Sequence, residues 1–441
     1  MTKRSSKLTL AVAVAALTFA SCGAPGDDSG SGSSASDAAV EAAEALGIDL
    51  DDCPADMTDP LGDTAKVGLT LPLTGGPAAA FAVLGPGVKS AFEEANAEAD
   101  LPTKFELILK DDQFQPDKTL VAARELVQKD GVVGFSGVTG TAGVLAIRDL
   151  LREECLPGIG LPGGGGTVLD PAYPEVVSGA VPFSLDARVW VEDVNERFPE
   201  GAKIATFIGN TESGKDYAEQ IDHWLEETGS KSTIVDKETI DAADAAAPSS
   251  AVTTMRNSGA EVLFAAPTGA QCISIMTEAA NQGWEPVIYM TTNCSSSTYF
   301  GAAGGAADGV LTLQTYKDVG SPRFADDAGV QRVRDVLKEY GGGVDLTNTT
   351  AYSGYVYGQM FVEAAKQAAA SDLGLSKLGL IVAARNLDFH PDMVADGIDF
   401  TTSGLSDVAP IEAGELNSWS VAEGGFQQGK LYDFEGELTQ K

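Results

Sequence analysis

The run Lys66-Val67-Gly68-Leu69-Thr70-Leu71 opens the pattern that decides the fold. It is a short, mainly apolar stretch, of the kind that forms a buried strand. An amphipathic stretch over 87–99 and a second apolar run over 105–109 follow it, which predicts a helix and then another strand. Strands that alternate with helices pair in parallel, and the helices cover both faces of the sheet. The start of the folded region therefore predicts a doubly wound α/β structure.

The same alternation continues along the chain in two separate runs. In the first run we expect further strands at 132–136 and 158–160 and helices at 119–127 and 142–151. In the second run we expect strands at 203–208, 233–238, 261–265 and 286–290 and helices at 217–228, 251–258 and 270–282. The segment 173–186 between the runs has no helical period and is interpreted as a crossover. Two runs predict two parallel sheets, each covered by helices.

The last third of the sequence is mainly helical. After a strand at 309–313 we expect helices at 330–340, 351–370 and 375–384 and a final strand at 418–421. These elements are too few for a third domain, so we expect them to complete the two lobes.

The N-terminus has the features of an export signal. Three basic residues precede an apolar run over 8–19, which is too short to span a bilayer as a helix. The run ends in Phe19-Ala20-Ser21-Cys22, which resembles a lipobox, so we expect Cys22 to be diacylated as the mature N-terminus. An ordinary secretory signal, cut near Ala20 or Ser21, is the alternative. We assign 1–21 to the signal peptide and 22–63 to the lipidated cysteine and a flexible linker or N-terminal extension.

Composition excludes several classes of partner. The net charge of −35 repels nucleic acid and anionic headgroups, so we expect neither a nucleic-acid partner nor electrostatic membrane binding. With only two histidines and no CxxC pair, we expect no metal site. The sequence also lacks the GxSxG, HExxH and P-loop motifs, so we expect no enzyme. The match of Gly158-x-Gly160-x-x-Gly163 to a dinucleotide fingerprint is discounted because the expected strand lies inside it, so no cofactor is expected.

Four cysteines remain if Cys22 carries lipid. In an exported chain they can form two disulfides in three possible pairings. Cys272 falls on an expected helix, and Cys294 follows the next expected strand, so the two would be neighbours in one βαβ unit. We therefore expect a Cys272–Cys294 disulfide and, by elimination, a Cys53–Cys155 disulfide.

The order of the elements, together with several short motifs, resembles type I periplasmic binding proteins, in particular the leucine/isoleucine/valine-binding family of ABC importers. The matching stretches are 67–75, 92–96, 109–113, Pro182-Phe183 with Asp186, 279–283 and 352–365. The resemblance extends from Thr64 to Phe426. It implies two doubly wound parallel-sheet lobes, joined by a three-segment hinge, that close on a ligand. We place the N-terminal lobe at 64–183 with 310–405 and the C-terminal lobe at 184–309 with 406–441.

The resemblance also implies a ligand site at the carboxyl ends of the strands, where helix N-termini hold a carboxylate. In the N-terminal lobe it points to Gly140 and Thr141, with Thr141 as hydroxyl donor or simply as a helix cap. It points further to the backbone of Gly163 and Gly164 and to Phe81 as an aromatic against the ligand or as core packing.

In the C-terminal lobe the resemblance points to Ser213, Gly269 and Asn293. Amino-acid binders of the family place an acid in the loop that corresponds to 290–297, to pair with the ligand's ammonium. This loop has no Asp or Glu, and a buried ammonium without a counter-charge is strongly disfavoured. Either another acid such as Glu212 takes that role, or the ligand is a carboxylate or other polar compound without an α-ammonium. We favour the second reading.

The resulting function is that of an extracytoplasmic solute-binding lipoprotein of an ABC importer. We expect it to be a monomer, anchored to the membrane through its lipid, with permease subunits as partners. A ligand-sensing receptor subunit with the same clamp is the alternative.

Overall fold

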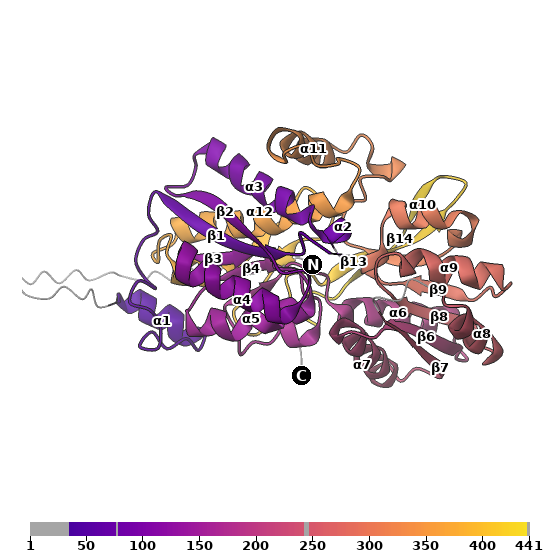
Figure 1. Ribbon diagram of the computed structural model, residues 1–441. Helices are drawn as coiled ribbons and strands as arrows, with labels where there is room; N and C mark the ends of the chain where they lie inside the picture. Colours follow the sequence, from indigo (N-terminus) through magenta and orange to yellow (C-terminus); the bar gives the residue numbers. More distant parts are fainter. Residues whose placement is uncertain (1–34, 76–77, 242–246, 439–441) are drawn as a thin grey trace, which may run out of the picture. The chain divides into compact units, whose positions relative to one another are not determined.

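The computed structural model describes residues 35–75, 78–241 and 247–438, so the predicted signal peptide and Cys22 lie outside the described residues. Two parallel-rich sheets organise the chain (Figure 1). The first sheet has five parallel strands in the order β2-β1-β3-β4-β5. Their bounds are β1 Thr64–Leu71, β2 Lys104–Asp111, β3 Gly134–Ser136, β4 Gly158–Leu161 and β5 Val176–Ser178. Val67, Leu69 and Leu71 of β1 are fully buried, as expected for a strand that is covered on both faces.

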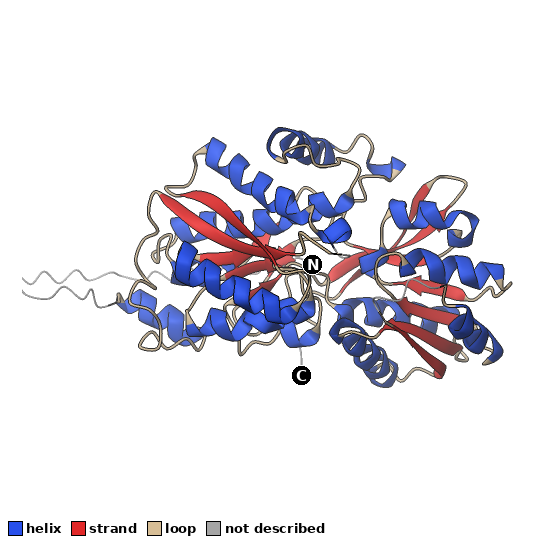
Figure 2. Ribbon diagram, in the orientation of Figure 1, coloured by secondary structure: helices blue, strands red, loops and turns tan. Residues whose placement is uncertain are grey.

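Helices pack on both faces of the first sheet (Figure 2). Those on one face are α3 Leu84–Glu98 and α12 Thr349–Ala370, with α11 Ala328–Tyr340 and α13 Lys377–Ala384 packed against them. Those on the other face are α4 Pro116–Glu125, which continues into a π-helical turn η1 Leu126–Asp130, and α5 Thr141–Glu153. Two short helices, α2 Ala78–Phe81 and η2 Gly166–Val168, follow β1 and β4. We call this sheet and its helices the N-terminal lobe.

The second sheet has seven strands in the order β14-β13-β10-β9-β8-β6-β7. The parallel strands are β6 Lys203–Gly209, β7 Thr233–Ile240, β8 Val262–Ala266, β9 Val287–Met290 and β10 Leu311–Gln314. An antiparallel hairpin, β13 Ala413–Ser420 and β14 Gly425–Asp433, extends the sheet beyond β10. Its helices are α6 Phe183–Arg197, α7 Glu212–Glu227, α8 Ser249–Asn257, α9 Gln271–Asn281, η3 Thr292–Cys294, α10 Ser297–Ala303 and η4 Gly304–Ala307. We call this group the C-terminal lobe.

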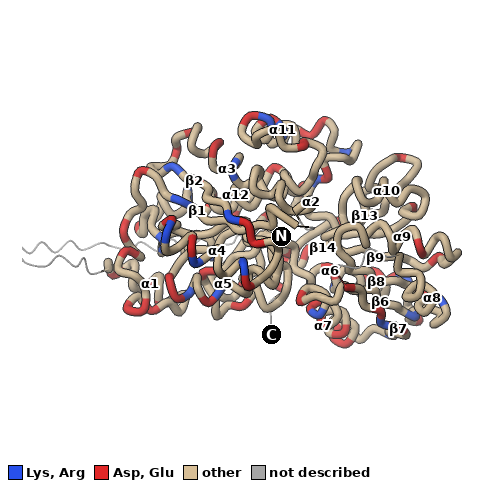
Figure 3. Tube along the Cα trace, viewed as in Figure 1, with Lys and Arg blue, Asp and Glu red and all other residues tan. Residues whose placement is uncertain are grey.

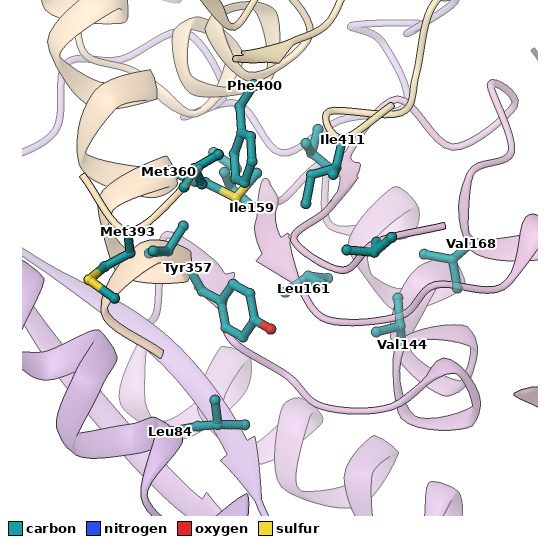
Figure 4. Close-up of a cluster of buried hydrophobic side chains, with 14 of the residues drawn as sticks. Leu84, Val144, Ile159, Leu161, Val168, Tyr357, Met360, Met393, Phe400 and Ile411 are labelled. Carbon is teal, nitrogen blue, oxygen red and sulfur yellow. The ribbon is translucent and has the colours of Figure 1, made fainter. Parts of the chain in front are cut away.

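The chain passes between the two sheets three times: after β5, after β10 and before β13. The late crossings include η5 Pro322–Phe324 and a small hairpin, β11 Asp388–Phe389 with β12 Phe400–Thr401. Apolar side chains from β4, α12 and these late segments meet in one buried cluster, which includes Ile159, Met360, Phe400 and Ile411 (Figure 4). The predicted fold class, two doubly wound lobes joined by three segments, is therefore confirmed.

Two sequence-based boundaries are wrong. The segment 173–186 is more than a crossover, because it contains β5 and the first turn of α6. Three residues make too short a run for a periodic signal, although Val176 and Val177 are buried. The N-terminal lobe does not resume at residue 310, because β10 pairs with β9 and β13 in the second sheet. Pairing partners, which decide lobe membership, are not visible in the sequence.

The structure also corrects the expectation of a flexible linker up to residue 63, for the residues from 35 onward that it describes. Residues 37–45 form helix α1, Asp37–Ala45, which Ser36 caps by accepting from the Ala39 N–H. Ala39, Ala43, Leu46, Ile48 and Met57 are buried. The backbone of Leu378 donates to the Met57 carbonyl, and Cys53 is disulfide-bonded to Cys155. The segment packs because small apolar side chains, Ala39 and Ala43, lie on one face of α1. The composition of the sequence alone suggested a flexible tether.

Both cysteine pairs named from the sequence are disulfides in the structure. Cys53 and Cys155 are 102 residues apart in the chain, and Cys272 and Cys294 are 22 apart. The first disulfide ties the N-terminal extension to the turn that follows α5. The second ties α9 to the loop after β9. Each therefore fixes a segment that the sheets alone do not hold.

Acidic side chains outnumber basic ones along the chain, and Figure 3 shows them spread over the helices of both lobes. Among the described residues, no helix combines the length and the apolar character needed to cross a bilayer.

Helices α3 and α12 cross closely because glycines lie at their contact. A Cβ on Gly87 would meet the Ala351 carbonyl oxygen and would lie 2.6 Å from the Tyr355 nitrogen. We expect Gly87→Ala to lower the free energy of unfolding by about 2 kcal/mol, because the backbone of α12 must move. Urea unfolding measures this. Gly301→Ala on α10 is the control, since a Cβ there meets nothing within 4 Å, and it should be neutral or stabilising. Equal effects of the two changes would contradict the close crossing.

Candidate functional site

Helix α5 begins at the carboxyl end of β3, where Gly140 and Thr141 lie. Gly140 has a φ of +89°, which favours glycine, and its N–H donates to the Pro162 carbonyl at 2.9 Å. No side chain caps the helix, and Thr141 is its first residue, 4% exposed. The first turn of a helix has N–H groups without helical partners and carries the positive end of the helix dipole. This end of α5 is therefore suited to bind an anion.

The glycine loop after β4 packs directly on this helix terminus. A Cβ on Gly163 would lie 3.4 Å from the Thr141 Cα, and one on Gly165 would lie 2.9 Å from its Cγ2. A Cβ on Gly164 would lie 2.6 Å from the Phe183 ring and 2.5 Å from the Val181 carbonyl oxygen. Only residues without a side chain allow the loop to approach this closely. The structure thus brings Gly140, Thr141 and Gly163 together, with Gly164 next in the same loop, and their part in ligand binding stays a prediction.

The C-terminal lobe meets this site through the N-terminal turns of α7. Thr211 caps α7 by accepting from the Gly214 N–H at 3.1 Å, which fixes the turn that carries Ser213. The Ser213 hydroxyl donates to the Thr141 Oγ1 at 3.4 Å. Asp216, one turn further on, accepts from the Gly166 N–H at 3.0 Å. Two hydrogen bonds therefore join the lobes beside the predicted site.

Asp216 is an acid that the sequence reasoning missed. Burial raises its pKa to about 6, against the hydrogen bond from the Gly166 N–H, which lowers it. Its Oδ2 is buried and accepts no hydrogen bond within the described chain. No sequence signal marks it, because a single Asp inside an amphipathic helix is ordinary.

Asp186 organises the loop after β9. Its Oδ2 accepts from the Tyr217 hydroxyl at 2.6 Å and from the Thr292 N–H at 2.9 Å. Tyr217 Oη also lies 2.5 Å from Thr291 Oγ1, and its ring stacks on Phe183 with a centroid distance of 4.4 Å. Burial raises the pKa of Asp186 to about 7, against the hydrogen bonds from Tyr217 and Thr292, which lower it. This buried cluster joins α6, α7 and the loop that carries Asn293.

Gly269 and Asn293 lie on neighbouring loops, after β8 and β9, which are paired strands. Gly269 has a φ of +58° and precedes α9, and the Asn293 N–H donates to Thr291 Oγ1 at 3.3 Å. The Cys272–Cys294 disulfide joins the start of α9 to the loop that carries Asn293. The hydrogen bonds of the described chain do not connect either residue to Thr141, so their part in a ligand site stays a prediction.

An aromatic pair stands beside the α5 terminus. The rings of Phe81 and Phe114 are stacked, with centroids 5.1 Å apart and planes 9° apart. A Cβ on Gly140 would lie 3.0 Å from Cε2 and Cζ of Phe114, so this ring reaches the residue that precedes Thr141. Phe81 was expected at the site, and Phe114 was not. The available signal was an aromatic residue in the short loop between β2, which ends at Asp111, and Pro116 at the start of α4.

Three carboxylates form a group that could hold a metal ion. Ligand atoms of Asp407, Glu412 and Glu435 lie within 4.8 Å of one another. Burial raises the pKa of Glu412 to about 7 and that of Asp407 to about 6. Glu412 already accepts from the Gly436 N–H at 2.5 Å and the Leu438 N–H at 3.0 Å. These bonds give the group a structural role near the last crossing.

A cavity of about 420 Å³ lies at the opposite end of the second sheet, where β9 and β10 begin. Asp193 lines it, and it accepts from Tyr289 Oη and Arg197 Nε, each at 2.5 Å. Its polar lining is thus engaged in core contacts, away from Thr141 and Ser213.

The N-terminal turns of α5 and α7, one from each lobe, meet beside the glycine loop after β4. This arrangement is typical of a two-lobed binding protein. A family model described as "Periplasmic binding protein" matches residues 64–404, so the chain belongs to the periplasmic binding protein family. This is a family of binding proteins rather than enzymes. Among curated protein sequences, none matches the chain significantly.

The descriptions of solved structures with a similar fold name different ligands or substrates. A branched-chain amino-acid ABC transporter protein from Thermus thermophilus, with bound valine, is 18% identical with a TM-score of 0.74, covering 85% of this chain and 97% of its own. A solute-binding protein of an ABC transporter from Rhodopseudomonas palustris BisB5, in complex with 3,4-dihydroxybenzoic acid, is 20% identical with a TM-score of 0.70, covering 84% and 98%. A fatty acid ABC transporter substrate-binding protein from Thermomonospora curvata is 16% identical with a TM-score of 0.69, covering 86% and 94%.

Proposed function

We propose that this protein is the extracytoplasmic solute-binding lipoprotein of an ABC importer, anchored through Cys22, and that it binds a small carboxylate between its lobes. The observation that carries the proposal is the meeting of Thr141, at the N-terminus of α5, with Ser213, in the first turn of α7. Membership of the periplasmic binding protein family supports it. The related structures named above, all from ABC transporters, support the transport role.

The polar groups at this meeting point favour a carboxylate. The α5 terminus lacks a side-chain cap, and the glycine loop brings bare backbone beside it. N–H groups at a helix terminus donate to an anion and gain from the helix dipole. The Thr141 and Ser213 hydroxyls can add further donors, one from each lobe.

The acids near the site do not favour an α-ammonium group on the ligand. Loop 290–297 has no Asp or Glu, and Glu212, the alternative partner considered from the sequence, is exposed and paired with Lys215 at 2.6 Å. Asp186 is buried in the second lobe, where its Oδ2 accepts from Tyr217 and Thr292. Asp216 accepts from the Gly166 N–H through Oδ1 only, so it is the acid through which an ammonium-bearing ligand would bind if the proposed ligand class were wrong. Because an unpaired buried ammonium is strongly disfavoured, the proposed ligand is a carboxylate without an α-amino group.

Closure of the lobes provides the mechanism. The contacts Ser213–Thr141 and Asp216–Gly166 form only when the lobes approach each other. A ligand that touches both lobes binds the closed form better and shifts the equilibrium toward it. The closed form is then the one that a permease would recognise.

Thr141→Val tests the site. The change keeps the shape of the side chain and removes its hydroxyl, so we expect affinity for the bound carboxylate to fall about 10-fold or more, as for a lost hydrogen bond to a charged group. Isothermal titration with benzoate, hexanoate, leucine and valine measures this, with Thr254→Val on exposed α8 as the control. Unchanged affinity in Thr141→Val would reject the site. Tight binding of leucine or valine, without binding of the non-amino carboxylates, would reject the ligand class.

A further inference from the structure

The loop after β2 holds Phe114 in an unusual backbone conformation. Gln113 and Phe114 have φ values of +55° and +59°, a region that residues with a Cβ rarely occupy, and here two occupy it in succession. Phe114 is also 42% exposed, although it is a large apolar side chain. Strained backbone that carries an exposed aromatic is a reason to look for function.

Two neighbouring acids fix this conformation. The buried Asp112 accepts from the Phe114 N–H at 2.8 Å and from the Thr119 hydroxyl at 3.1 Å, which ties the loop to α4. Asp111 accepts from the Gln113 N–H at 3.1 Å and the Leu73 N–H at 2.9 Å, which ties the loop to the segment after β1. The hydrogen bond from the Thr74 hydroxyl to Asp111, with those from the backbone N–H groups of Leu73 and Gln113, lowers the pKa of Asp111 to about 2. The ring of Phe114 is therefore held in place before any ligand arrives.

The place where the ring is held lies next to the proposed carboxylate site. Cε2 and Cζ, at the far end of the ring, lie 3.0 Å from the position that a Cβ on Gly140 would take, directly before Thr141. Phe81 stacks in parallel on Phe114 and covers one face of that ring, and Phe114 is still 42% exposed, so the pair presents a rigid apolar surface. A carboxylate bound at the α5 terminus would have the rest of its body beside this surface.

From this geometry we propose that Phe114 contacts the ligand and determines its specificity, and that the ligand is a carboxylate whose apolar part is an aromatic ring. Aromatic rings pack on one another in offset or edge-to-face arrangements, which a pre-positioned pair of rings supports better for a planar group than for a puckered or branched one. This inference rests on the proposed function, because it assumes a carboxylate at Thr141.

Isothermal titration with a matched panel tests the inference. Benzoate, 3,4-dihydroxybenzoate, cyclohexanecarboxylate, hexanoate and valine are compared on the wild type and on Phe114→Leu, Phe114→Tyr and Phe114→Ala. We expect benzoate or its dihydroxy derivative to bind at least 5-fold tighter than cyclohexanecarboxylate. We expect Phe114→Tyr to keep this preference, Phe114→Leu to abolish it, and Phe114→Ala to weaken binding of the aromatic acid about 10-fold.

Val121→Ala is the control, because Val121 lies on α4 and is 61% exposed. It should leave every affinity unchanged, and melting curves should show that all variants are folded. Equal binding of benzoate and cyclohexanecarboxylate, or unchanged affinity in Phe114→Ala, would overturn the role of Phe114. If either result were found while Thr141→Val clearly weakened carboxylate binding, the carboxylate site would stand, and only the proposed aromatic ligand class would be rejected. Binding of no carboxylate in the panel would reject both proposals.

Discussion

Replacing Arg385 with methionine is expected to lower the free energy of unfolding by about 3–5 kcal/mol, because the change leaves buried polar groups without partners. Arg385 follows α13 and is 1% exposed. Its Nε donates to the Pro174 carbonyl at 2.9 Å, and its Nη2 donates to the Tyr173 and Val176 carbonyls, each at 2.8 Å. A late segment of the chain thereby holds the start of β5.

The charge on Arg385 is retained in the interior. Burial lowers its pKa to about 10, and the nearby Glu175 opposes the shift, so the guanidinium stays protonated at neutral pH. Burial also raises the pKa of Glu175, against the effects of Arg152 and Arg385. Methionine fills much of the same space, but it removes the donors to the Pro174, Tyr173 and Val176 carbonyls and the positive charge near the buried Glu175.

Urea unfolding at pH 7 measures the effect. Arg256→Met is the matched control, because Arg256 is an exposed cation that donates to one carbonyl, that of Gln282, at 2.7 Å. That change should cost less than about 1 kcal/mol, as for other exposed charged groups. If the two variants lost similar free energies of unfolding, the buried hydrogen bonds of Arg385 would contribute no more to stability than an exposed one does.

Stability is expected to rise as the pH falls from 7.5 to 5, and Asp186 is expected to contribute one of the largest shares of this change. Its folded-state pKa of about 7 lies above its ordinary value of 3.8, so the folded protein binds the proton more tightly than the unfolded chain does. The stabilisation is complete below about pH 4 and is lost as the pH rises through 7. At about 1.4 kcal/mol for each pKa unit, the whole effect is about 4 kcal/mol.

Other buried acids act in the same direction. Burial raises the pKa of Glu412 to about 7 and that of Asp216 to about 6. Hydrogen bonds lower the pKa of Asp111 to about 2. The stability that its charge contributes is therefore lost only well below pH 5, outside the range from pH 5 to 7.5. Asp186→Asn should therefore remove only its own share of the pH dependence.

Chemical unfolding of the wild type and of Asp186→Asn at pH 5 and pH 7.5 checks this. Asparagine keeps an acceptor for the Tyr217 hydroxyl and the Thr292 N–H but has no charge at either pH. The variant should show a markedly smaller difference between the two pH values. Asp222→Asn, at an exposed position paired with Lys237, should keep the wild-type difference. A full wild-type difference in Asp186→Asn would assign the pH dependence to other groups.

Local sequence patterns predicted most of the architecture. Strands β1, β2, β6, β7 and β8 and helices α3, α5, α9 and α12 were placed close to their observed bounds, because apolar period and run length are local properties. Strand β5 and helix α10 were missed, since three or seven residues give little periodic signal. Helix α6 was missed because it is buried on most sides, so its sequence has no clear division into an apolar and a polar face. Helix α1 was missed because its alanine-rich sequence borders a tether-like segment.

The site was predicted unevenly for the same reason. Thr141, Gly163 and Gly164 are recognisable because turns and helix starts have their own residue preferences, and the structure brings them together. Phe114, Asp186 and Asp216 act through partners on other elements, and no local pattern marks such pairs. The sequence by itself determined two alternating α/β lobes, the positions of the loops at the strand ends and the absence of an acid in loop 290–297. Only the tertiary structure decided which acids are buried and which aromatic stands over Gly140, because these depend on contacts between segments far apart in the chain.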